Sequence, residues 1–421
     1  MARRAGILAP AVIAVILLIL AGGGSAHAAP TIQAAPAVTD GGVVNNFPDG
    51  MVFSVHAESV SNITDIRLRY EVLPDGTAAT ARPQFAQAKS VDAQVTLDTY
   101  LAPGTVIKYH WEALAGSSAS ATDEATFVYD DTRFQWQVLD TDNLAIHHYS
   151  GSDEDAQKLH GVGVQALADA EALLNTQVPF GVNVWIYDST DDMRPALPRT
   201  SPAFESQIIT EGIKIASNTV LVLGGVSYDT LRHELTHVVT ALAGDSPFGT
   251  LPNWLDEGTA VHAQQDPGGF GDAIEQAISR GNVLSVREIG SYPGDPQKVE
   301  LFYGEAWSLV SFLVDTYGQE KFAQLFASVK SGKTFDEALQ VSYGFDQDGL
   351  ENAWRAAKGL PPAATQAPTG PAQQGSPTVT PRPSGDGGGT STGTLIAIAA
   401  GVLVLAGLVG FGGITLARRL G

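Results

Sequence analysis

The 421-residue sequence predicts an α+β protein with two folded regions and one apolar helix near the C-terminus. Three patterns carry this prediction. Residues 31–131 contain short segments in which apolar and polar side chains alternate, and residues 133–358 pass from a few strands to apolar residues at helical spacing. Residues 395–417 are predominantly apolar. A few strands followed mostly by helices are typical of the α+β class.

The charge and the composition exclude several classes of function. The formal net charge is −21 at pH 7, whereas a nucleic-acid-binding protein needs a basic face. The chain has no cysteine, which excludes disulfides, thiolate metal ligands and a cysteine nucleophile. A chain of 421 residues is long enough for two domains with sizeable cores. We therefore expect two folded domains and no nucleic-acid partner.

Residues 1–28 have the three parts of a secretory signal. Arg3 and Arg4 are followed by an apolar run over residues 7–21 and then by small residues that end at Ala28. This order predicts a signal peptide that is cleaved after Ala28. The alternative is an uncleaved signal anchor.

Residues 31–131 are predicted to form a β-sandwich. Apolar side chains alternate with polar ones over residues 65–72 and 106–113, which is typical of strands with one buried face. Further strands are expected over residues 53–55, 95–97 and 125–129. Several short strands separated by Pro- and Gly-containing turns indicate a sandwich. Residues 101–113 resemble the turn and following strand of fibronectin type III or immunoglobulin-like domains, which implies a spacing or binding role.

The second domain is predicted over residues 133–358 and begins with strands. The predicted strands cover residues 134–139, 144–149, 182–187, 208–215 and 219–223. A long helix is expected over residues 152–176, because apolar residues recur on one face and its first turn is acidic, where the helix dipole favours negative charge. His147 and His148 are neighbours on a predicted strand and face opposite sides, so they form a poor chelating pair.

The segment from Leu231 to His237 contains two histidines with the spacing of a metal site. His233 and His237 are four residues apart, so both imidazoles project from one face of a helix. That spacing lets two neutral nitrogens bind one zinc ion at about 2.0–2.1 Å. Glu234 then lies beside the metal, where its carboxylate can take a proton from water.

The flanking residues favour a helix with these histidines on its non-apolar face. Ser227 is a suitable N-cap, and the helix is expected to run to Ala243 with Gly244 as its terminator. Four apolar residues share one face, and by the step of about 100° per residue the histidines point to roughly the opposite side. The four are Leu231, Leu235, Val238 and Leu242. A pair of core histidines would lie on the apolar stripe, so the pattern favours a metal site, although the string alone also occurs by chance.

A third ligand is expected further along the chain. A catalytic zinc site needs at least three protein ligands and keeps one position open for water. Glu257 lies 20 residues after His237, far enough for the chain to turn back and present a carboxylate. Asp256 and His262 are the alternatives to Glu257 as the third ligand.

Residues 254–260, Trp-Leu-Asp-Glu-Gly-Thr-Ala, resemble the third-ligand segment of gluzincin metallopeptidases, the group that contains thermolysin and the alanyl-type aminopeptidases. The resemblance implies a thermolysin-like domain with Glu234 as the general base. The zinc ligands that it implies are His233, His237 and Glu257. The metzincin pattern is absent, because Thr240 and Ala243 stand where that pattern has Gly and His.

The resemblance extends over residues 134–358. Residues 301–318 look like the helix after the active site in the bacterial peptidase MA-like branch. It implies that the Tyr303 hydroxyl stabilises the oxyanion on the scissile carbon, as a tyrosine or histidine does in gluzincins. The alternative is that Tyr303 only packs in the core, because Tyr303 and the apolar residues that follow it have the spacing of one helix face. Further helices are expected over residues 319–329, 334–343 and 347–357.

Two departures from the family pattern concern the substrate and the zinc site. Alanyl-type aminopeptidases carry Gly-x-Met-Glu-Asn before the zinc helix to hold the free amine of the substrate, and residues 210–214 do not match it. This favours an endopeptidase over an aminopeptidase. Thermolysin-like enzymes carry an Asp four residues after the glutamate ligand to orient a histidine, and that position is Val261 here. The sequence therefore does not identify the groups that orient the zinc ligands.

The C-terminal part predicts a tether. Residues 360–394 are rich in Pro, Thr, Gly, Ser and Gln, which is typical of an extended linker. Residues 395–417 are long and apolar enough to span a bilayer. The positive-inside rule then puts residues 418–421, with Arg418 and Arg419, in the cytoplasm. A lipid-anchor signal is the alternative, and the terminal arginines argue against it.

Together these patterns predict a single-pass cell-membrane protein whose two folded domains lie outside the cytoplasm. The expected activity is that of a zinc metallopeptidase that acts on a peptide or protein substrate, as an endopeptidase rather than an aminopeptidase. The alternative is a surface binding or adhesion protein with a catalytically inactive metallopeptidase-like domain.

Overall fold

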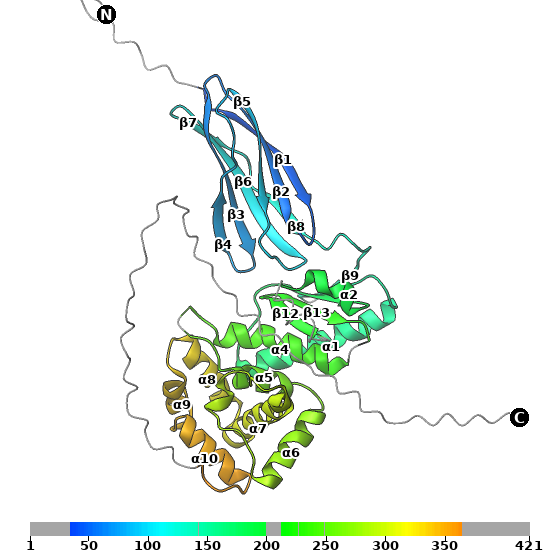
Figure 1. Ribbon diagram of the computed structural model, residues 1–421, viewed down its shortest axis with the longest axis vertical. Helices are drawn as coiled ribbons and strands as arrows, with labels where there is room; N and C mark the ends of the chain where they lie inside the picture. Colours follow the sequence, from blue (N-terminus) through cyan, green and yellow to red (C-terminus); the bar gives the residue numbers. More distant parts are fainter. Residues whose placement is uncertain (1–33, 142, 199–211, 226, 248, 364–421) are drawn as a thin grey trace, which may run out of the picture.

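The computed structural model describes residues 34–141, 143–198, 212–225, 227–247 and 249–363. A β-rich part, a mixed sheet with helices, and a helical lobe follow one another along the long axis of the molecule (Figure 1). The predicted signal, the linker from residue 364 on and the apolar C-terminal helix lie outside the described residues. Within those residues, no helix combines the length and the apolar character that crossing a membrane requires.

Two antiparallel sheets form the N-terminal part. One sheet consists of β1 (Ala37–Asn45), β2 (Met51–Glu58) and β5 (Ser90–Leu97). The other consists of β4 (Thr77–Ala81), β3 (Ile63–Leu73), β6 (Thr105–Ala115), β7 (Ser118–Ala121) and β8 (Ala125–Tyr129). Every second residue of β6 is buried, including the fully enclosed Trp111, so the alternation in the sequence reports this core correctly.

The sequence did not predict three of these strands, β1, β4 and β7. The register of β1 shifts between Asp40 and Val43, where Gly41 and Gly42 interrupt the alternation. Strands β4 and β7 are built from alanine, serine and threonine, which give little contrast between a buried and an exposed face. Alternation detects strands with large buried side chains and misses strands such as these.

The second part is built on a mixed sheet in the order β12-β13-β11-β10-β9. Its strands are β9 (Gln137–Thr141), β10 (Leu144–His148), β11 (Val182–Tyr187), β12 (Gly212–Ala216) and β13 (Thr219–Leu223). Strands β10, β11 and β13 are parallel, and the two outer strands are antiparallel to them. The first strand begins three residues later than predicted, because Phe134 and Trp136 pack instead in an aromatic cluster with Tyr149.

The two faces of this sheet are buried against different partners. Val184 and Ile146 point into the core shared with α1 (Asp153–Leu174) and α4 (Tyr228–Gly244). Their neighbours on the other face, such as Trp185, belong to the core that contains the β-rich part. Neighbouring strand residues point to opposite faces, so one strand serves both cores.

The β-rich part joins the sheet through a packed junction. The Tyr187 hydroxyl donates to Asp131, 2.9 Å away, and Arg133 pairs with the same buried carboxylate at 2.6 Å. Gly104 has a left-handed φ of 82°, and a Cβ there would come within 3.1 Å of the Trp185 ring. The contact between the two parts is therefore close and specific, as in a protein core.

After α4, six further helices of the described residues form the helical lobe. They are α5 (Asn253–His262), α6 (Gly269–Arg280), α7 (Val299–Tyr317), α8 (Gln319–Lys330), α9 (Phe335–Tyr343) and α10 (Gln347–Ala357). The predicted ranges for the last four agree within two residues at each end, whereas α6 was not predicted. Helix α7 packs closely on two neighbours, because a Cβ at Gly258 would lie 2.3 Å from the Ala306 oxygen and one at Gly304 would lie 2.2 Å from the Phe270 oxygen.

Buried carboxylates hold the segment between α6 and α7, residues 281–298. Glu305 on α7 accepts a hydrogen bond from the Leu284 N–H at 2.9 Å, and Glu351 on α10 accepts one from the Val286 N–H at 3.2 Å. Both glutamates are at most 5% exposed. We call this segment the strap, since it crosses the helical lobe and is tied to it by side chains from two helices.

Glu305 makes the stability of the lobe dependent on pH. Burial raises the pKa of Glu305 from 4.5 to about 8, so the folded state favours the protonated side chain. The stability that this protonation contributes is complete below about pH 4.5 and is lost as the pH rises through about 8. We expect the free energy of unfolding of the wild type to fall between pH 5 and pH 9 by on the order of a few kcal/mol more than that of Glu305→Gln. The glutamine oxygen still accepts from Leu284 but cannot ionise.

Urea titrations of both proteins at several pH values, with chelator present throughout, measure this difference. The slope of the urea dependence reports whether the two proteins expose the same surface on unfolding. Parallel pH profiles for the two proteins would show that Glu305 does not ionise in this range.

Candidate active site

Helix α4 carries the predicted His-Glu-x-x-His segment. The Ser227 side chain caps its N-terminus by accepting from the Thr230 N–H at 3.1 Å, as expected, and the helix ends at Gly244, one residue later than predicted. The apolar face, with Leu231 and Leu235, packs into the core with α1 and the sheet. The face that carries the histidines is also buried, and helix α5 packs against α4.

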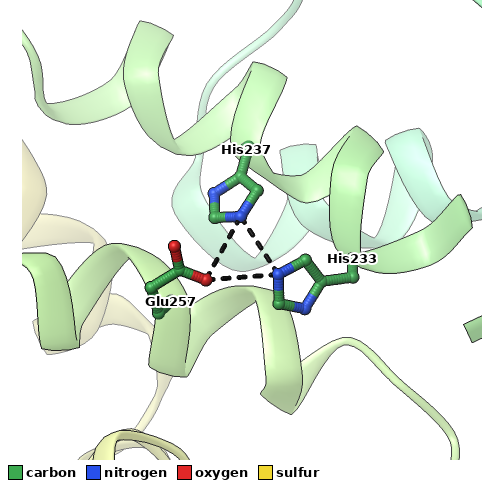
Figure 2. A group of neighbouring side chains, drawn as sticks. All are labelled: His233, His237 and Glu257. Carbon is green, nitrogen blue, oxygen red and sulfur yellow. Dashed lines mark hydrogen bonds and ion pairs between the residues drawn. The ribbon is translucent and has the colours of Figure 1, made fainter. Parts of the chain in front are cut away.

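The structure brings His233, His237 and Glu257 together. The Nε2 atoms of the two histidines are 3.1 Å apart, and Oε2 of Glu257 lies 3.2 Å from Nε2 of His233 and 3.5 Å from Nε2 of His237. Figure 2 shows the three atoms pointing at one another from α4 and α5. We call these residues the triad.

The triad fits a tetrahedral zinc ion. Ligand atoms about 2.0–2.1 Å from a tetrahedral ion lie about 3.3 Å from one another, which matches the three separations in the triad. All three residues are at most 8% exposed. Among the described residues, Oε2 of Glu257 receives no hydrogen bond of good geometry, which is costly for a buried carboxylate oxygen unless a cation balances it.

The charges in the triad also favour a cation. Burial by itself would raise the pKa of Glu257, but the imidazoles of His237 and His233 hold it far below its ordinary value, so Glu257 is ionised. Burial would lower the pKa of His237, but the carboxylates of Asp256 and Glu257 raise it well above 6.5. Without a metal, His237 therefore carries a proton that zinc has to displace, which makes zinc binding weaker at low pH.

Each histidine has a partner for its second ring nitrogen. Nδ1 of His237 lies 3.0 Å from Oδ1 of Asp256, which also accepts from the Thr240 hydroxyl. Nδ1 of His233 lies 3.0 Å from Nε2 of the Gln264 amide, and turning this amide by about 180° puts its oxygen in the same place. A partner that accepts from Nδ1–H fixes the orientation of a ligating imidazole and leaves Nε2 for the metal.

Two alternatives for the third ligand lie outside the triad. Asp256 contacts Nδ1 of His237, on the side of this ring that faces away from the triad, where it can orient the histidine. His262 contacts the Ser311 hydroxyl at 3.0 Å, away from the triad. His147 and His148 bond to Asn183 and to the Ser150 carbonyl and form no chelating pair, as expected.

Glu234 and His233 line an open pocket. Its Oε2 accepts from the Lys214 N–H on strand β12 at 2.9 Å, and burial raises its pKa above 4.5. Its Oε1 has no partner among the described residues. The pocket has a volume of about 310 Å³, and its lining includes Glu234, His233, Gln264 and Phe270. Glu234 therefore lines the pocket and keeps one buried oxygen without a partner among the described residues.

The Tyr303 side chain reaches the triad from α7. Its ring stacks on Phe270 with centroids 4.9 Å apart and lies 6.4 Å from the His233 ring. The hydroxyl is buried without a partner among the described residues. Burial, and then the carboxylates of Glu257 and Glu234, raise the pKa of Tyr303 well above 10, so it remains a hydrogen-bond donor. Tyr303 contributes to the core and also places an unused donor at the site.

A second tyrosine, Tyr292 on the strap, was not identified from the sequence. Its hydroxyl donates to Oε1 of Glu257, the oxygen that does not face the histidines. Tyr292 lies in a segment without regular periodicity, so no sequence pattern connects it to α5. Only the fold brings this residue to the triad.

The fold and the triad define a class of protein: an α+β domain with a candidate zinc centre made of two histidines from one helix and a glutamate from the next. Residues 163–358 match the family model described as the Peptidase MA superfamily. This part of the chain is therefore a Peptidase MA superfamily domain. It contains the triad, Glu234 and Tyr303. A comparison with curated proteins finds no match.

Solved structures similar to this chain include zinc metallopeptidases. An M1 zinc metallopeptidase from Deinococcus radiodurans has a TM-score of 0.37 and 12% identity, with 74% of this chain and 91% of that chain covered. A two-domain M1 zinc metallopeptidase variant bound to L-arginine has a TM-score of 0.38 and 12% identity, with 75% and 90% covered. BhCBM56 has a TM-score of 0.17 and 13% identity, and the match covers 23% of this chain and 96% of that one.

Proposed function

We propose that this protein is a zinc-dependent metallopeptidase that hydrolyses peptide bonds. The observation that carries the proposal is the triad, whose three ligand atoms converge and whose residues all interact electrostatically with Glu234. The family match to the Peptidase MA superfamily supports it. Zinc bound by the triad would polarise a carbonyl and lower the pKa of a water molecule.

The side chains around the triad support this proposal. Glu234 accepts the proton of the attacking water at Oε1 and passes it to the leaving amine, and its raised pKa suits both transfers. The Lys214 N–H holds the other oxygen, so the base keeps its orientation. Tyr303 donates its unused hydroxyl to the oxygen that becomes negative as the tetrahedral carbon forms.

The strand beside the site favours a substrate that runs past it. Strand β12 is the outermost strand of its sheet among the described residues, and its Lys214 contacts Glu234. Gly212 allows this approach, because a Cβ there would lie 3.0 Å from Cγ of Glu234. An edge strand can accept an extended peptide by backbone pairing. We therefore propose an endopeptidase, in agreement with the absence of the aminopeptidase segment.

The site is proposed to lie outside the cytoplasm, tethered to the cell membrane. The support comes from the sequence of residues 1–28 and of residues 395–417, both outside the described residues. The linker over residues 360–394 would let the folded part reach substrates at some distance from the bilayer.

Peptide cleavage with and without chelator tests the proposed function. The purified full-length chain is incubated with a diverse peptide library, and the cleavage sites are identified by mass spectrometry. We expect internal cuts that chelator abolishes and added Zn²⁺ restores. Cuts that persist in chelator would contradict a zinc mechanism, and release of single N-terminal residues would contradict an endopeptidase. Zinc binding without any cleavage would indicate the binding or adhesion protein instead.

A further inference from the structure

We propose that Tyr292 is a positioning residue that fixes the zinc-ligating glutamate from the strap. The inference rests on the proposed zinc site, since it assigns a task to a residue that faces one of the three ligands. Tyr292 belongs to the strap, residues 281–298, which has no role in the proposed hydrolysis itself.

The two oxygens of Glu257 face different partners. Oε2 faces the histidines at 3.2 and 3.5 Å, and Oε1 accepts the hydrogen bond of the Tyr292 hydroxyl. A carboxylate can turn about its terminal bond and bind a metal through one or both oxygens. The hydrogen bond from Tyr292 occupies Oε1 and directs Oε2 to the metal.

The strap holds the Tyr292 hydroxyl in place. Leu284, Val286 and Ile289 are buried in the core of the lobe, and two of them are hydrogen-bonded to Glu305 and Glu351 as described above. Beyond these anchors, Arg287 pairs with Asp348 at 2.7 Å and with Asp336 at 3.3 Å.

The ring of Tyr292 has its own support. It packs against Phe302 of α7 with centroids 5.4 Å apart, and 39% of the residue remains exposed. Contacts on the strap and on α7 thus set the direction of the hydroxyl before any metal binds. This kind of support around a ligand typically changes metal affinity or activity by about 10- to 100-fold.

Tyr292 and Tyr303 have distinct tasks in this arrangement. The Tyr292 hydroxyl is already engaged with Glu257, whereas the Tyr303 hydroxyl has no partner among the described residues. Only Tyr303 therefore has a donor available for the substrate. The two tyrosines form a matched pair for an experiment, because each loses a single hydroxyl on substitution by phenylalanine.

Zinc affinity separates the two tasks. The full-length wild type, Tyr292→Phe and Tyr303→Phe are titrated with Zn²⁺ against a chromophoric chelator of known affinity. We expect the zinc Kd to rise about 10-fold or more in Tyr292→Phe and to stay within about twofold of the wild type in Tyr303→Phe. Tyr303→Phe is expected to lower kcat in the peptide assay. Equal thermal unfolding of the zinc-free proteins verifies that the variants are folded.

An unchanged zinc Kd in Tyr292→Phe would overturn the positioning role, and so would a loss of turnover without a loss of affinity. The titration also works on a protein that cuts no peptide. If the wild type binds zinc but has no peptidase activity, the proposed function fails, and the Kd of Tyr292→Phe still decides whether Tyr292 positions Glu257.

Discussion

Replacing Glu234 by glutamine is expected to lower kcat for peptide cleavage by about 10²–10⁴-fold with little change in zinc content. Glutamine keeps the size of the side chain, and its amide oxygen can still accept from the Lys214 N–H, which is 2.9 Å from the glutamate in the wild type. It cannot accept a proton from water. The triad is unaffected, because Glu234 is not one of its members.

The measurement pairs turnover with elemental analysis. Glu234→Gln and the wild type are assayed with the same peptide, and bound zinc is counted in each protein. A variant that keeps zinc and loses turnover assigns the base to Glu234. Turnover at the wild-type level would contradict this role, and loss of zinc together with turnover would place Glu234 among the groups that hold the metal.

The parts of the site that the sequence predicts are those encoded by short spacings on one element. His233 and His237 lie one helical turn apart, so a single helix sets their relation, and Glu257 belongs to a compact motif. The expected N-cap at Ser227 formed for the same local reason. Strands with large alternating side chains and the last four helices were predicted for similar reasons.

The parts of the site that the sequence does not predict depend on contacts between elements. Asp256 reaches His237 only because α5 crosses α4, and Gln264 reaches His233 only after the chain has left α5. The position of Asp256 directly before Glu257 indicates a place near the zinc site, but the sequence does not distinguish a ligand from a group that orients one. Tyr292 needs the whole strap to reach Glu257. Such partners follow from tertiary packing, which no local period encodes.

The close packing of α7 explains how distant segments complete one site. Gly258, directly after Glu257, lets the backbone of α7 approach α5, and Gly304, directly after Tyr303, lets α6 approach α7. A larger side chain at either position would separate the helices and move the glutamate or the tyrosine away from the histidines. Gly258 and Gly304 therefore help to keep Glu257 and Tyr303 near the histidines.

Replacing Glu257 by glutamine is expected to remove most of the stabilisation of the fold by zinc. A ligand that binds only the folded state stabilises it by about 4.1 kcal/mol when its free concentration is 1,000 times Kd. Glutamine has nearly the shape of glutamate and can still accept from Tyr292, but it lacks the charge that holds Oε2 as an ionised ligand. A carboxylate binds zinc through that charge, and losing a ligand costs more than the 10- to 100-fold that is typical of a group that only orients one, so Glu257→Gln should bind zinc weaker by more than about 100-fold.

Thermal unfolding with buffered free zinc and with chelator measures this effect, and Asp256→Asn is the matched control. Its side chain touches His237 from outside the triad, so we expect a loss of zinc affinity of about 10- to 100-fold, smaller than that of Glu257→Gln. A zinc-dependent rise in Tm that survives in Glu257→Gln but disappears in Asp256→Asn would exchange the two roles and make Asp256 the third ligand. The order of the two effects thus decides which of two adjacent carboxylates binds the metal and which one orients the histidine that does.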